Sequence, residues 1–560
     1  MEQIHIDGLD LLSLKKGDFT MAKKIESFGV MLDFSRNAVM TLPALKSFLT
    51  TIRKMGYNTL FLYMEDTYEV EGEPYFGYMR SRYSIEEMKE IDEFCSSIGI
   101  EAIPCIQTLA HMRTFFKWGQ VPVDCDDILL AENERTYALI ENMFKTLSTC
   151  FKSKRIHIGM DEAHMLGKGR YFHEHGFVPS NEIIKKHLAK ICEIAKPYGY
   201  DLMIWSDMFI RSWNQGTYYL KENKPVPKDV AESIPDSVIP VYWDYYNTTE
   251  EMYDCMFQVH KQFSNKTWFG GGLWCWTGYA PNNEYSIRNT REALKSCNKN
   301  GIKNIFFTMW GDDGSECSHF SQLPALCYVA EYARGNRDEE KIKAKFKRIV
   351  GMSYDDFMKT DIPNYITPDA PRKRENPSKY MLYTDPFLGF NDYTVVEGSN
   401  EIYKRHAEEL SAIAKKSRKY GYVFNTLAAL CDVLSIKSEL GVKTRAAYKS
   451  GDKEELLRLA KEDYAMLDKK IKALHKAFSK QWYIDNKPSG FEVHDGRLGA
   501  LILRVLSCKN RLIDYAEGRV DKLDELEADI LPFGGLSKGE PITSTCYGRI
   551  VTANQFTHGI

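Results

Sequence analysis

Residues 155–164 have the sequence Arg155-Ile156-His157-Ile158-Gly159-Met160-Asp161-Glu162-Ala163-His164. The stretch joins a short apolar run, typical of a buried strand, to two adjacent carboxylates. In α/β barrels, catalytic side chains gather at the carboxyl ends of the strands. The stretch therefore predicts that Asp161 and Glu162 lie at an active site. Adjacent strand residues project to opposite faces, so we expect each acid to have a separate task.

Seven similar runs alternate with helical patterns over the first 335 residues. The expected strands are Phe28–Leu32, Thr59–Met64, Ala102–Gln107, Arg155–Gly159, Leu202–Ser206, Val238–Trp243, Thr267–Trp274 and Ile305–Trp310. The helices expected between them are Leu42–Met55, Ser84–Ser97, Arg135–Cys150, Asn181–Ala195, Thr248–Phe263 and Ser286–Asn300. Ser84, with Glu87 three residues later, predicts a capping box. Eight such units predict an α/β fold, a (β/α)8 TIM barrel, although residues 209–235 show only a short helical pattern.

After about Gly335 the sequence changes to long stretches with helical period. The helices expected there are Asn400–Ser417, Phe424–Ser450, Asp452–Phe478 and Arg497–Glu517. The stretch Thr360–Asn391 is rich in Pro, Asp, Asn and Tyr and is expected to be irregular. The expected organisation is an N-terminal extension over residues 1–24, a catalytic barrel over 25–335 and a mainly helical C-terminal domain over 336–560.

Composition excludes several classes of function. The chain has 560 residues, 44% of them hydrophobic, and a formal net charge of -3. Without a basic excess, nucleic acid and anionic membrane surfaces are poor partners. The sequence contains no uncharged run of about 18 apolar residues that would predict a membrane span, and residues 1–20 lack the pattern of a secretory signal. The expected location is therefore cytoplasmic. The thirteen cysteines show no C-x-x-C pair and are expected to be reduced and mostly buried.

Polar or aromatic groups stand at every expected strand end. Any one of them has a structural explanation, because a Trp often fills a core and an Asp often caps a helix. Together they have the composition of a sugar site, in which aromatic rings stack on pyranose faces and charged groups bind hydroxyls. These residues are Asp33, Arg36, Glu65, Asp66, His111, Asp161, Glu162, Trp205, Asp207, Trp243, Asp244, Tyr245, Trp274, Trp276, Tyr279, Trp310 and Asp312.

Two mechanisms fit a pair of acids at a sugar. A general acid and a protein nucleophile need carboxyl groups about 5–5.5 Å apart across the glycosidic bond, which is awkward for adjacent residues. In the alternative, the substrate's own 2-acetamido oxygen attacks the anomeric carbon and forms an oxazoline-type intermediate. Glu162 then protonates the leaving oxygen, and Asp161 stabilises the acetamido N–H. The adjacency favours this second mechanism.

The motif His157-x-Gly159-x-Asp161-Glu162 resembles the signature of glycoside hydrolase family 20, the β-N-acetylhexosaminidases. The similarity covers roughly residues 25–330. Only about 25 residues precede the first strand, too few for the extra α/β domain of many members. The third-strand segment reads Thr108-Leu109-Ala110-His111 rather than the commoner Met-Pro-Gly-His. The chain is therefore most similar to the short, hexosaminidase D-like subgroup of the family.

The resemblance also implies roles for the strand-end residues. Sugar hydroxyls would be held by Arg36 and Asp312, with Glu65, Asp66 and His111 at matching strand ends. The walls of the acetamido pocket would be Trp205, Trp243 and Trp310, and Trp276 is expected to be a further substrate contact. A Tyr would donate to the acetamido carbonyl, and Tyr279 is slightly favoured over Tyr245.

The expected function is that of a retaining exo-β-N-acetylhexosaminidase acting on terminal non-reducing β-GlcNAc or β-GalNAc. The sequence does not rank these two sugars, and it does not name the natural linkage or say whether sulfate is tolerated. We expect β-linked N-acetylhexosamine glycans or glycoconjugates as partners, and no cofactor and no metal. The resemblance is compatible with a homodimer.

Several alternatives stay open on the sequence alone. The main rival is a barrel glycosidase with Asp207 or Asp244 as nucleophile, and a non-catalytic sugar-binding barrel is another. The D-E-A-H letters of residues 161–164 lack the upstream phosphate loop of a helicase. The three histidines His164, His173 and His175 match no zinc motif. The turn at 486–491 is expected to be a helix entry, with a contact to an active site as the less favoured interpretation.

Overall fold

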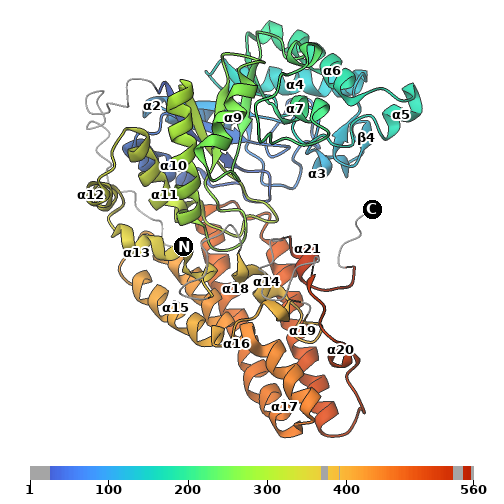
Figure 1. The fold of residues 1–560 in the computed structure, drawn as a ribbon, viewed down its shortest axis with the longest axis vertical. Helices are drawn as coiled ribbons and strands as arrows, with labels where there is room; N and C mark the ends of the chain where they lie inside the picture. The colour runs from blue at the N-terminus through green and yellow to red at the C-terminus, as the bar shows by residue number, and fades with distance from the viewer. Residues whose placement is uncertain (1–24, 367–375, 390, 534–545, 556–560) are drawn as a thin grey trace.

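Eight parallel strands close into one barrel in the computed structural model, which describes residues 25–366, 376–389, 391–533 and 546–555. The order around the barrel is β1-β10-β9-β8-β7-β6-β3-β2 (Figure 1). The barrel strands are β1 (Ser27–Asp33), β2 (Thr59–Tyr63), β3 (Glu101–Cys105), β6 (Arg155–His157), β7 (Asp201–Trp205), β8 (Ile239–Trp243), β9 (Trp268–Gly272) and β10 (Asn304–Met309). This confirms the predicted barrel and its eight strands. The predicted N-terminal extension lies outside the described residues.

Large aromatic side chains fill the interior of the barrel. The ring centroids of Phe61 and Phe306 lie 4.3 Å apart, and those of Phe61 and Trp268 lie 6.0 Å apart. A Cβ atom at Gly270 would lie 3.2 Å from the Phe306 ring and 3.3 Å from the Trp205 ring. Such rings need a small neighbour, so glycine on β9 makes room for them.

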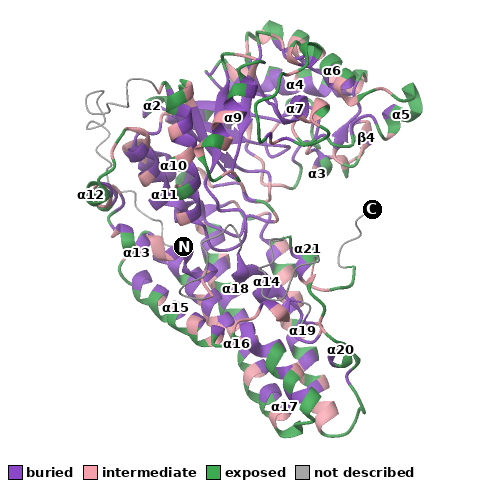
Figure 2. Ribbon diagram, in the orientation of Figure 1, coloured by how far each residue is buried: buried purple, intermediate pink, exposed green. Residues whose placement is uncertain are grey.

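Helices follow the strands and cover the outside of the barrel. Their inner faces are buried and their outer faces exposed (Figure 2). The capping box at Ser84 and Glu87 is present at the start of α2. Where the sequence showed only a short helical pattern, α7 and α8 are short. The helices are α1 (Leu42–Met55), α2 (Ile85–Ser97), α3 (Arg113–Phe116), α4 (Glu134–Cys150), α5 (Arg170–His175), α6 (Ser180–Ala195), α7 (Asp207–Trp213), α8 (Lys228–Ala231), α9 (Glu250–His260), α10 (Asn283–Asn300) and α11 (Leu323–Ala333).

One element beside the barrel was not predicted. The short strands β4 (Val123–Cys125) and β5 (Ile128–Leu129) pair antiparallel in a small sheet of their own. The hairpin lies between β3 and α4 in the chain. Strands of two or three residues are too short to give a periodic signal.

The C-terminal part is helical and lies below the barrel in Figure 1. The stretch expected as one helix from Asp452 is interrupted by a π-helical turn at Ala460–Tyr464. A short helix, α14, lies within the stretch expected to be irregular. The helices are α12 (Glu339–Val350), α13 (Tyr354–Met358), α14 (Pro377–Tyr383), α15 (Ser399–Ala414), α16 (Gly421–Ser450), α17 (Lys453–Leu459), α18 (Ala465–Asp485), α19 (Glu492–Ala516), α20 (Asp524–Glu527) and α21 (Tyr547–Ile550).

Two further properties concern the whole described chain. All thirteen cysteines are free. Within the described residues, none of the helices combines the length and the apolar character needed to cross a bilayer.

Candidate active site

A cavity of about 310 Å³ opens among the loops that follow the barrel strands. The predicted site residues line it, except Glu65, Asp66 and Tyr279, and two residues that were not predicted, Tyr246 and Asp313, join them. The lining residues are Arg36, His111, Asp161, Glu162, Trp205, Trp243, Tyr245, Tyr246, Trp276, Trp310, Asp312 and Asp313.

The two acids lie on a sharp turn rather than on a strand. Strand β6 ends at His157, two residues earlier than expected, and Gly159, Met160 and Glu162 have φ values of 70°, 70° and 52°. A Cβ atom at Gly159 would lie 2.0 Å from Oε1 of Gln107, so only glycine fits there. The separate environments of the acids therefore come from this left-handed turn and not from strand alternation.

Asp161 is held as an anion. Gln107 Nε2 donates to Asp161 Oδ1 at 2.8 Å, and His111 Nε2 lies 3.2 Å from Asp161 Oδ2. Burial favours the neutral carboxyl, but the charge of His111 and the Gln107 hydrogen bond outweigh it and lower the pKa of Asp161 to about 2. Burial likewise opposes the charge of His111, yet Asp161 raises the pKa of that imidazole to about 10. The two side chains form an ion pair at neutral pH.

Glu162 has a different environment, because its side chain is 45% exposed. Its backbone N–H donates to Asp207 Oδ2 at 3.1 Å, which ties the left-handed turn to the start of α7. Asp207 is fully buried, and burial, followed by the charges of Asp161 and Glu162, raises its pKa to about 7. Glu162 is therefore fixed through its backbone while its carboxyl group faces the cavity.

A second charged group lies across the cavity. Arg36 NH1 is 3.2 Å from Asp33 Oδ2 and 3.5 Å from Glu65 Oε1, and its guanidinium lies 5.3 Å from the Trp310 ring centroid. Solvent reaches Asp312 through the cavity, yet the surrounding protein raises the pKa of Asp312 to about 6, against the charge of Arg36. The cavity thus offers a fixed cation beside a carboxyl group, which suits sugar hydroxyls.

Two of the predicted substrate contacts support the site from behind. Glu65 accepts a hydrogen bond from the Tyr63 hydroxyl at 3.2 Å and pairs with Arg36. Asp66 pairs with Arg80. Neither lines the cavity, because both carboxylates are already bound to neighbouring protein groups. Their contacts with the substrate stay predictions, and in this structure both carboxylates pair with arginines of neighbouring loops.

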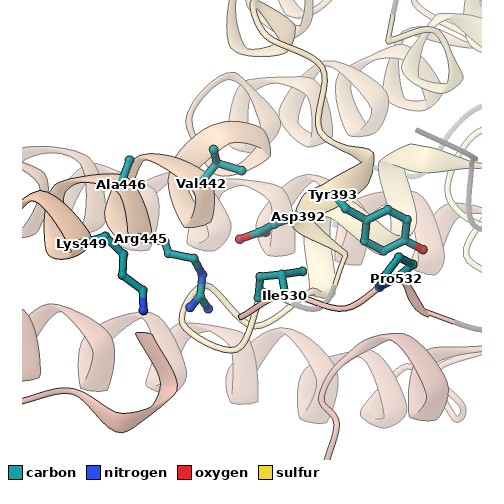
Figure 3. A pocket seen from close by; sticks show the side chains of 8 residues that line it. All are labelled: Asp392, Tyr393, Val442, Arg445, Ala446, Lys449, Ile530 and Pro532. Atoms are coloured by element: carbon teal, nitrogen blue, oxygen red, sulfur yellow. The ribbon is translucent and has the colours of Figure 1, made fainter. Parts of the chain in front are cut away.

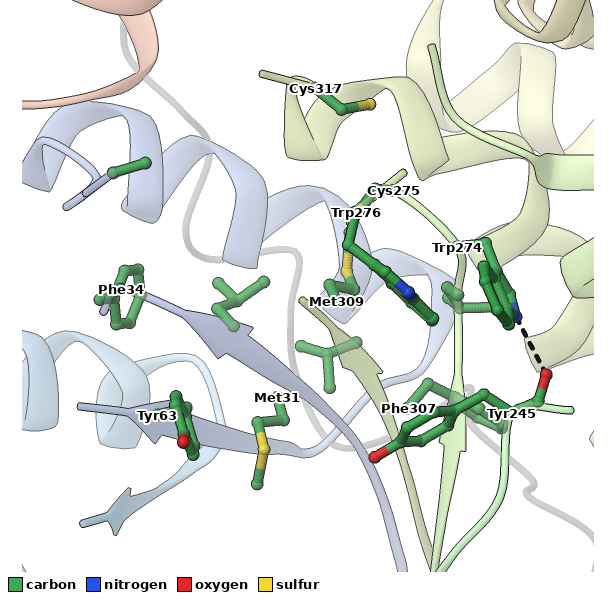
Figure 4. Packing of buried hydrophobic residues seen from close by; sticks show 14 of the residues in the cluster. Met31, Phe34, Tyr63, Tyr245, Trp274, Cys275, Trp276, Phe307, Met309 and Cys317 are labelled. Atoms are coloured by element: carbon green, nitrogen blue, oxygen red, sulfur yellow. Dashed lines mark hydrogen bonds between the residues drawn. The ribbon is translucent and has the colours of Figure 1, made fainter. Parts of the chain in front are cut away.

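Aromatic rings form the walls of the cavity. The centroids of Trp243 and Tyr245 lie 5.3 Å apart with the rings stacked, and Tyr245 meets the edge of Trp276 at 5.7 Å. Figure 4 shows Tyr245 and Trp276 together, with the Trp274 indole N–H donating to the Tyr245 carbonyl at 3.1 Å. These contacts fix the Tyr245 backbone and direct its ring into the wall.

Tyr279, the favoured tyrosine, lies elsewhere. Its hydroxyl is 2.8 Å from that of Tyr383, and its ring packs on Phe478 at 5.0 Å, so it faces the helical domain. The preference for Tyr279 over Tyr245 is therefore corrected. Trp205 and Trp310, whose centroids are 6.4 Å apart, do line the cavity.

The helical domain holds the loop that carries Asp312. Asp313 Oδ2 is 2.9 Å from Lys379 Nζ, and Asp313 Oδ1 is 2.9 Å from an Arg497 nitrogen. Lys379 and Arg497 also pair with Glu316 at 2.7 and 3.2 Å. Sequence analysis missed this link because Lys379 and Arg497 lie 66 and 184 residues away in the chain.

The remaining sequence features are placed as follows. The turn at 486–491 packs on the barrel loops, where the Lys487 N–H donates to the Val39 carbonyl at 2.7 Å and Ser489 Oγ to the Met79 carbonyl at 2.9 Å. It does not line the cavity. Across the described part of the chain, no group of three or more His, Cys, Asp or Glu is arranged to hold a metal ion.

A larger hollow of about 590 Å³ lies in the helical domain (Figure 3). Arg445 on its wall donates to backbone carbonyls of Phe387, Leu526 and Ala528 at 2.6–3.0 Å, so its charge already serves to join segments of the domain. The hollow has no paired acids facing each other and is not the candidate active site. Its lining residues are Asp392, Tyr393, Val442, Arg445, Ala446, Lys449, Ile530 and Pro532.

Comparison with known families agrees with this geometry. Residues 28–226 match the catalytic domain of glycosyl hydrolase family 20, and residues 355–545 match the glycoside hydrolase 20C C-terminal domain. The chain belongs to glycoside hydrolase family 20. The second match lies on the helical domain that holds Asp313, so both the barrel and that domain resemble family members.

Among curated relatives, human hexosaminidase D is 24% identical over 335 residues, which cover 54% of this chain and 64% of that protein. Hexosaminidase D of Bos taurus is 23% identical over 337 residues, 54% of this chain and 90% of that protein. The chain thus spans less than two thirds of the human relative.

Solved structures of the family are also similar. An exo-β-N-acetylglucosaminidase from Vibrio harveyi in complex with N-acetylglucosamine is 11% identical, with a TM-score of 0.44, covering 61% of this chain and 59% of that one. A β-N-acetylhexosaminidase from Bacteroides fragilis is 17% identical, with a TM-score of 0.44, covering 59% of this chain and 70% of that one.

Proposed function

We propose that the protein is a retaining exo-β-N-acetylhexosaminidase that removes terminal non-reducing β-GlcNAc or β-GalNAc by substrate-assisted catalysis. The observation that carries the proposal is the contrast between two adjacent acids. Asp161 is held ionised by Gln107 and His111, whereas Glu162 is 45% exposed at the cavity. Two adjacent carboxyl groups with different environments suit two different tasks on one sugar.

In the proposed reaction, the acetamido carbonyl oxygen of the substrate attacks the anomeric carbon while Glu162 gives its proton to the leaving oxygen. Asp161 accepts a hydrogen bond from the acetamido N–H and stabilises the positive charge of the oxazolinium ion. Glu162 then takes a proton from a water molecule, which attacks the anomeric carbon from the face that the leaving group has left and opens the intermediate. Two inversions give retention of configuration. A low pKa of Asp161, about 2, keeps it charged throughout.

The cavity supports the remaining assignments. Of the two tyrosines considered from the sequence, Tyr245 lines the cavity and would donate to the acetamido carbonyl, while Arg36 and Asp312 would hold ring hydroxyls. A cavity of about 310 Å³ has room for one sugar at a chain end rather than for the middle of a polymer. The action is therefore proposed to be exo.

The rival mechanism needs a protein nucleophile, and neither candidate lines the cavity. Asp207 is fully buried behind Glu162. Asp244 is 1% exposed and accepts hydrogen bonds from the Tyr242 hydroxyl at 2.5 Å and from the Tyr246 N–H at 3.0 Å. A nucleophile must reach the anomeric carbon, so substrate assistance is the better supported mechanism.

Hydrolysis of aryl β-GlcNAc, aryl β-GalNAc and aryl β-glucoside, with N-acetylglucosamine thiazoline as inhibitor, tests the proposal. We expect activity on the two acetamido sugars only, and inhibition by the thiazoline, which mimics the bound oxazoline. Glu162→Gln should lose turnover of substrates with poor leaving groups, and Asp161→Asn should slow the assisted step. Equal hydrolysis of the glucoside would point to a protein nucleophile, and full activity of both variants would refute the assignment.

The proposal extends to the class of natural substrate and to the location of the protein. The substrates are β-linked N-acetylhexosamine glycans or glycoconjugates. Thirteen free cysteines suit a reducing compartment, which supports a cytoplasmic location. Homodimerisation stays a prediction from the sequence.

A further inference from the structure

Three aromatic side chains form a cluster on the catalytic face of the barrel. Tyr75 and Tyr78 follow β2, and Trp118 follows α3. Their ring centroids lie 5.2–6.1 Å apart in all three pairs. Tyr75 and Tyr78 are 42% and 41% exposed. We call this cluster the aromatic rim.

The aromatic rim is held by a buried base. Phe76, between the two tyrosines, is fully buried and packs on Tyr68 at 5.1 Å and Phe115 at 5.0 Å. Arg80 ties the same loop to Asp66, at the end of β2. The exposed rings therefore sit on a fixed platform, so binding a ligand costs little ordering of the loop.

Exposed apolar side chains of the barrel are confined to this face. In the described barrel residues, every strongly exposed large hydrophobic side chain follows the carboxyl end of β2, β6 or β8. They are Tyr75, Tyr78, Met79, Met165, Phe172, Phe177 and Tyr246. Exposed apolar groups restricted to one face of a barrel are typical of a binding surface on that face.

The direction of the substrate connects the cavity to the rim. The proposed acid Glu162 is the exposed member of the pair, and His111 Nε2 lies 3.9 Å from its Oε2. Directly after His111 the chain enters α3, which leads to Trp118. A substrate whose terminal sugar lies in the cavity must extend outward past Glu162. The loop after β3 borders Glu162 through His111. The loop that carries Tyr75 and Tyr78 is joined by Arg80 to Asp66, the neighbour of Glu65, which pairs with Arg36 on the cavity wall.

We propose that Tyr75, Tyr78 and Trp118 form a subsite for the leaving part of the substrate, stacking on a pyranose ring beyond the cleaved bond. Tyrosine and tryptophan suit this ligand because their faces are apolar and their edges are polar. The natural substrate is then an oligosaccharide or glycan rather than a single sugar on a small aglycone. This inference rests on the proposed function.

The test compares a series of β-GlcNAc oligosaccharides of two to four sugars with the aryl β-GlcNAc. In the double variant Tyr75→Ala, Tyr78→Ala, the ratio of kcat/KM for the longer oligosaccharides to kcat/KM for the aryl glycoside should fall about tenfold, the size expected for two lost stacking contacts. Tyr75→Phe, Tyr78→Phe should keep the ratio. Tyr483→Ala, at a tyrosine of α18 that is somewhat more exposed (53%), is the control and should keep the ratio too.

The outcomes separate the two proposals. An unchanged ratio in the double alanine variant overturns the subsite, even if the wild-type enzyme is active. A wild-type enzyme inactive on every acetamido substrate refutes the proposed function instead. If sedimentation shows a wild-type dimer that the double alanine variant dissociates, the rim is an interface between copies of the chain and the subsite is wrong.

Discussion

Replacing Asp161 by Asn should lower the pKa of His111 from about 10 toward its ordinary value of 6.5. In the wild type the carboxylate 3.2 Å from Nε2 outweighs burial. The difference between about 10 and 6.5 corresponds to about 5 kcal/mol at most, shared between the two partners. With a neutral amide in place of Asp161, burial and the charge of Arg36 favour the neutral imidazole. The carboxylates of Glu65, Asp127 and Glu162 still favour the charged form, the last two at 3.8 and 3.9 Å from the imidazole nitrogens.

The assay is NMR of the protein with 15N-labelled histidine between pH 5 and 10.5. The histidine signal that is missing from the spectrum of His111→Gln is assigned to His111. The buried His187, whose pKa is lowered to about 4 by burial and which has no contribution from Asp161, is the internal control and should not move. A wild-type His111 that titrates near 6.5, or one that titrates alike in Asp161→Asn, would refute the proposed ion pair.

The same pair predicts a dependence of stability on pH. A folded-state pKa above the unfolded value means that His111 contributes stability fully below pH 6.5 and loses it as pH rises through about 10. The loss of unfolding free energy in Asp161→Asn should therefore be largest near pH 6 and smaller at pH 10.5. Urea unfolding at the two pH values measures it.

Three further changes probe the loops around the site. Lys379→Met removes the fully buried cation that pairs with Asp313 and Glu316 and should lower the free energy of unfolding in urea by about 3–5 kcal/mol. A decrease below about 1 kcal/mol would contradict the link between the barrel and the helical domain. Gly159→Ala places a Cβ atom 2.0 Å from a buried amide oxygen and should lose more unfolding free energy than Gly176→Ala, where φ is 71° but nothing lies within 4 Å. Asp207→Asn removes a negative charge, present above a pKa of about 7, from behind Glu162, the proposed acid. The alkaline limb of the kcat/KM profile should then move to lower pH by about one unit, and an unmoved limb would argue against this coupling.

The barrel itself could be predicted because its signals are local. Strands such as Thr59–Tyr63 are short apolar runs, and the capping box at Ser84 lies within four residues. Strand ends meet at one face of a barrel, so the side chains at those ends could be expected to line one cavity. The short β4–β5 hairpin and the π-helical turn at Ala460–Tyr464 leave no such periodic signal.

The sequence by itself determined the barrel and the acids Asp161 and Glu162, because apolar periodicity and strand-end chemistry are written in consecutive residues. Only the tertiary structure decided how those acids differ. Gln107 holds one acid and Asp207 holds the other, from 54 and 45 residues away. The tertiary structure also decided the position of Tyr279, which lies against Tyr383 and away from the cavity. These are contacts between distant parts of the chain, which depend on the packing of side chains that no local pattern specifies.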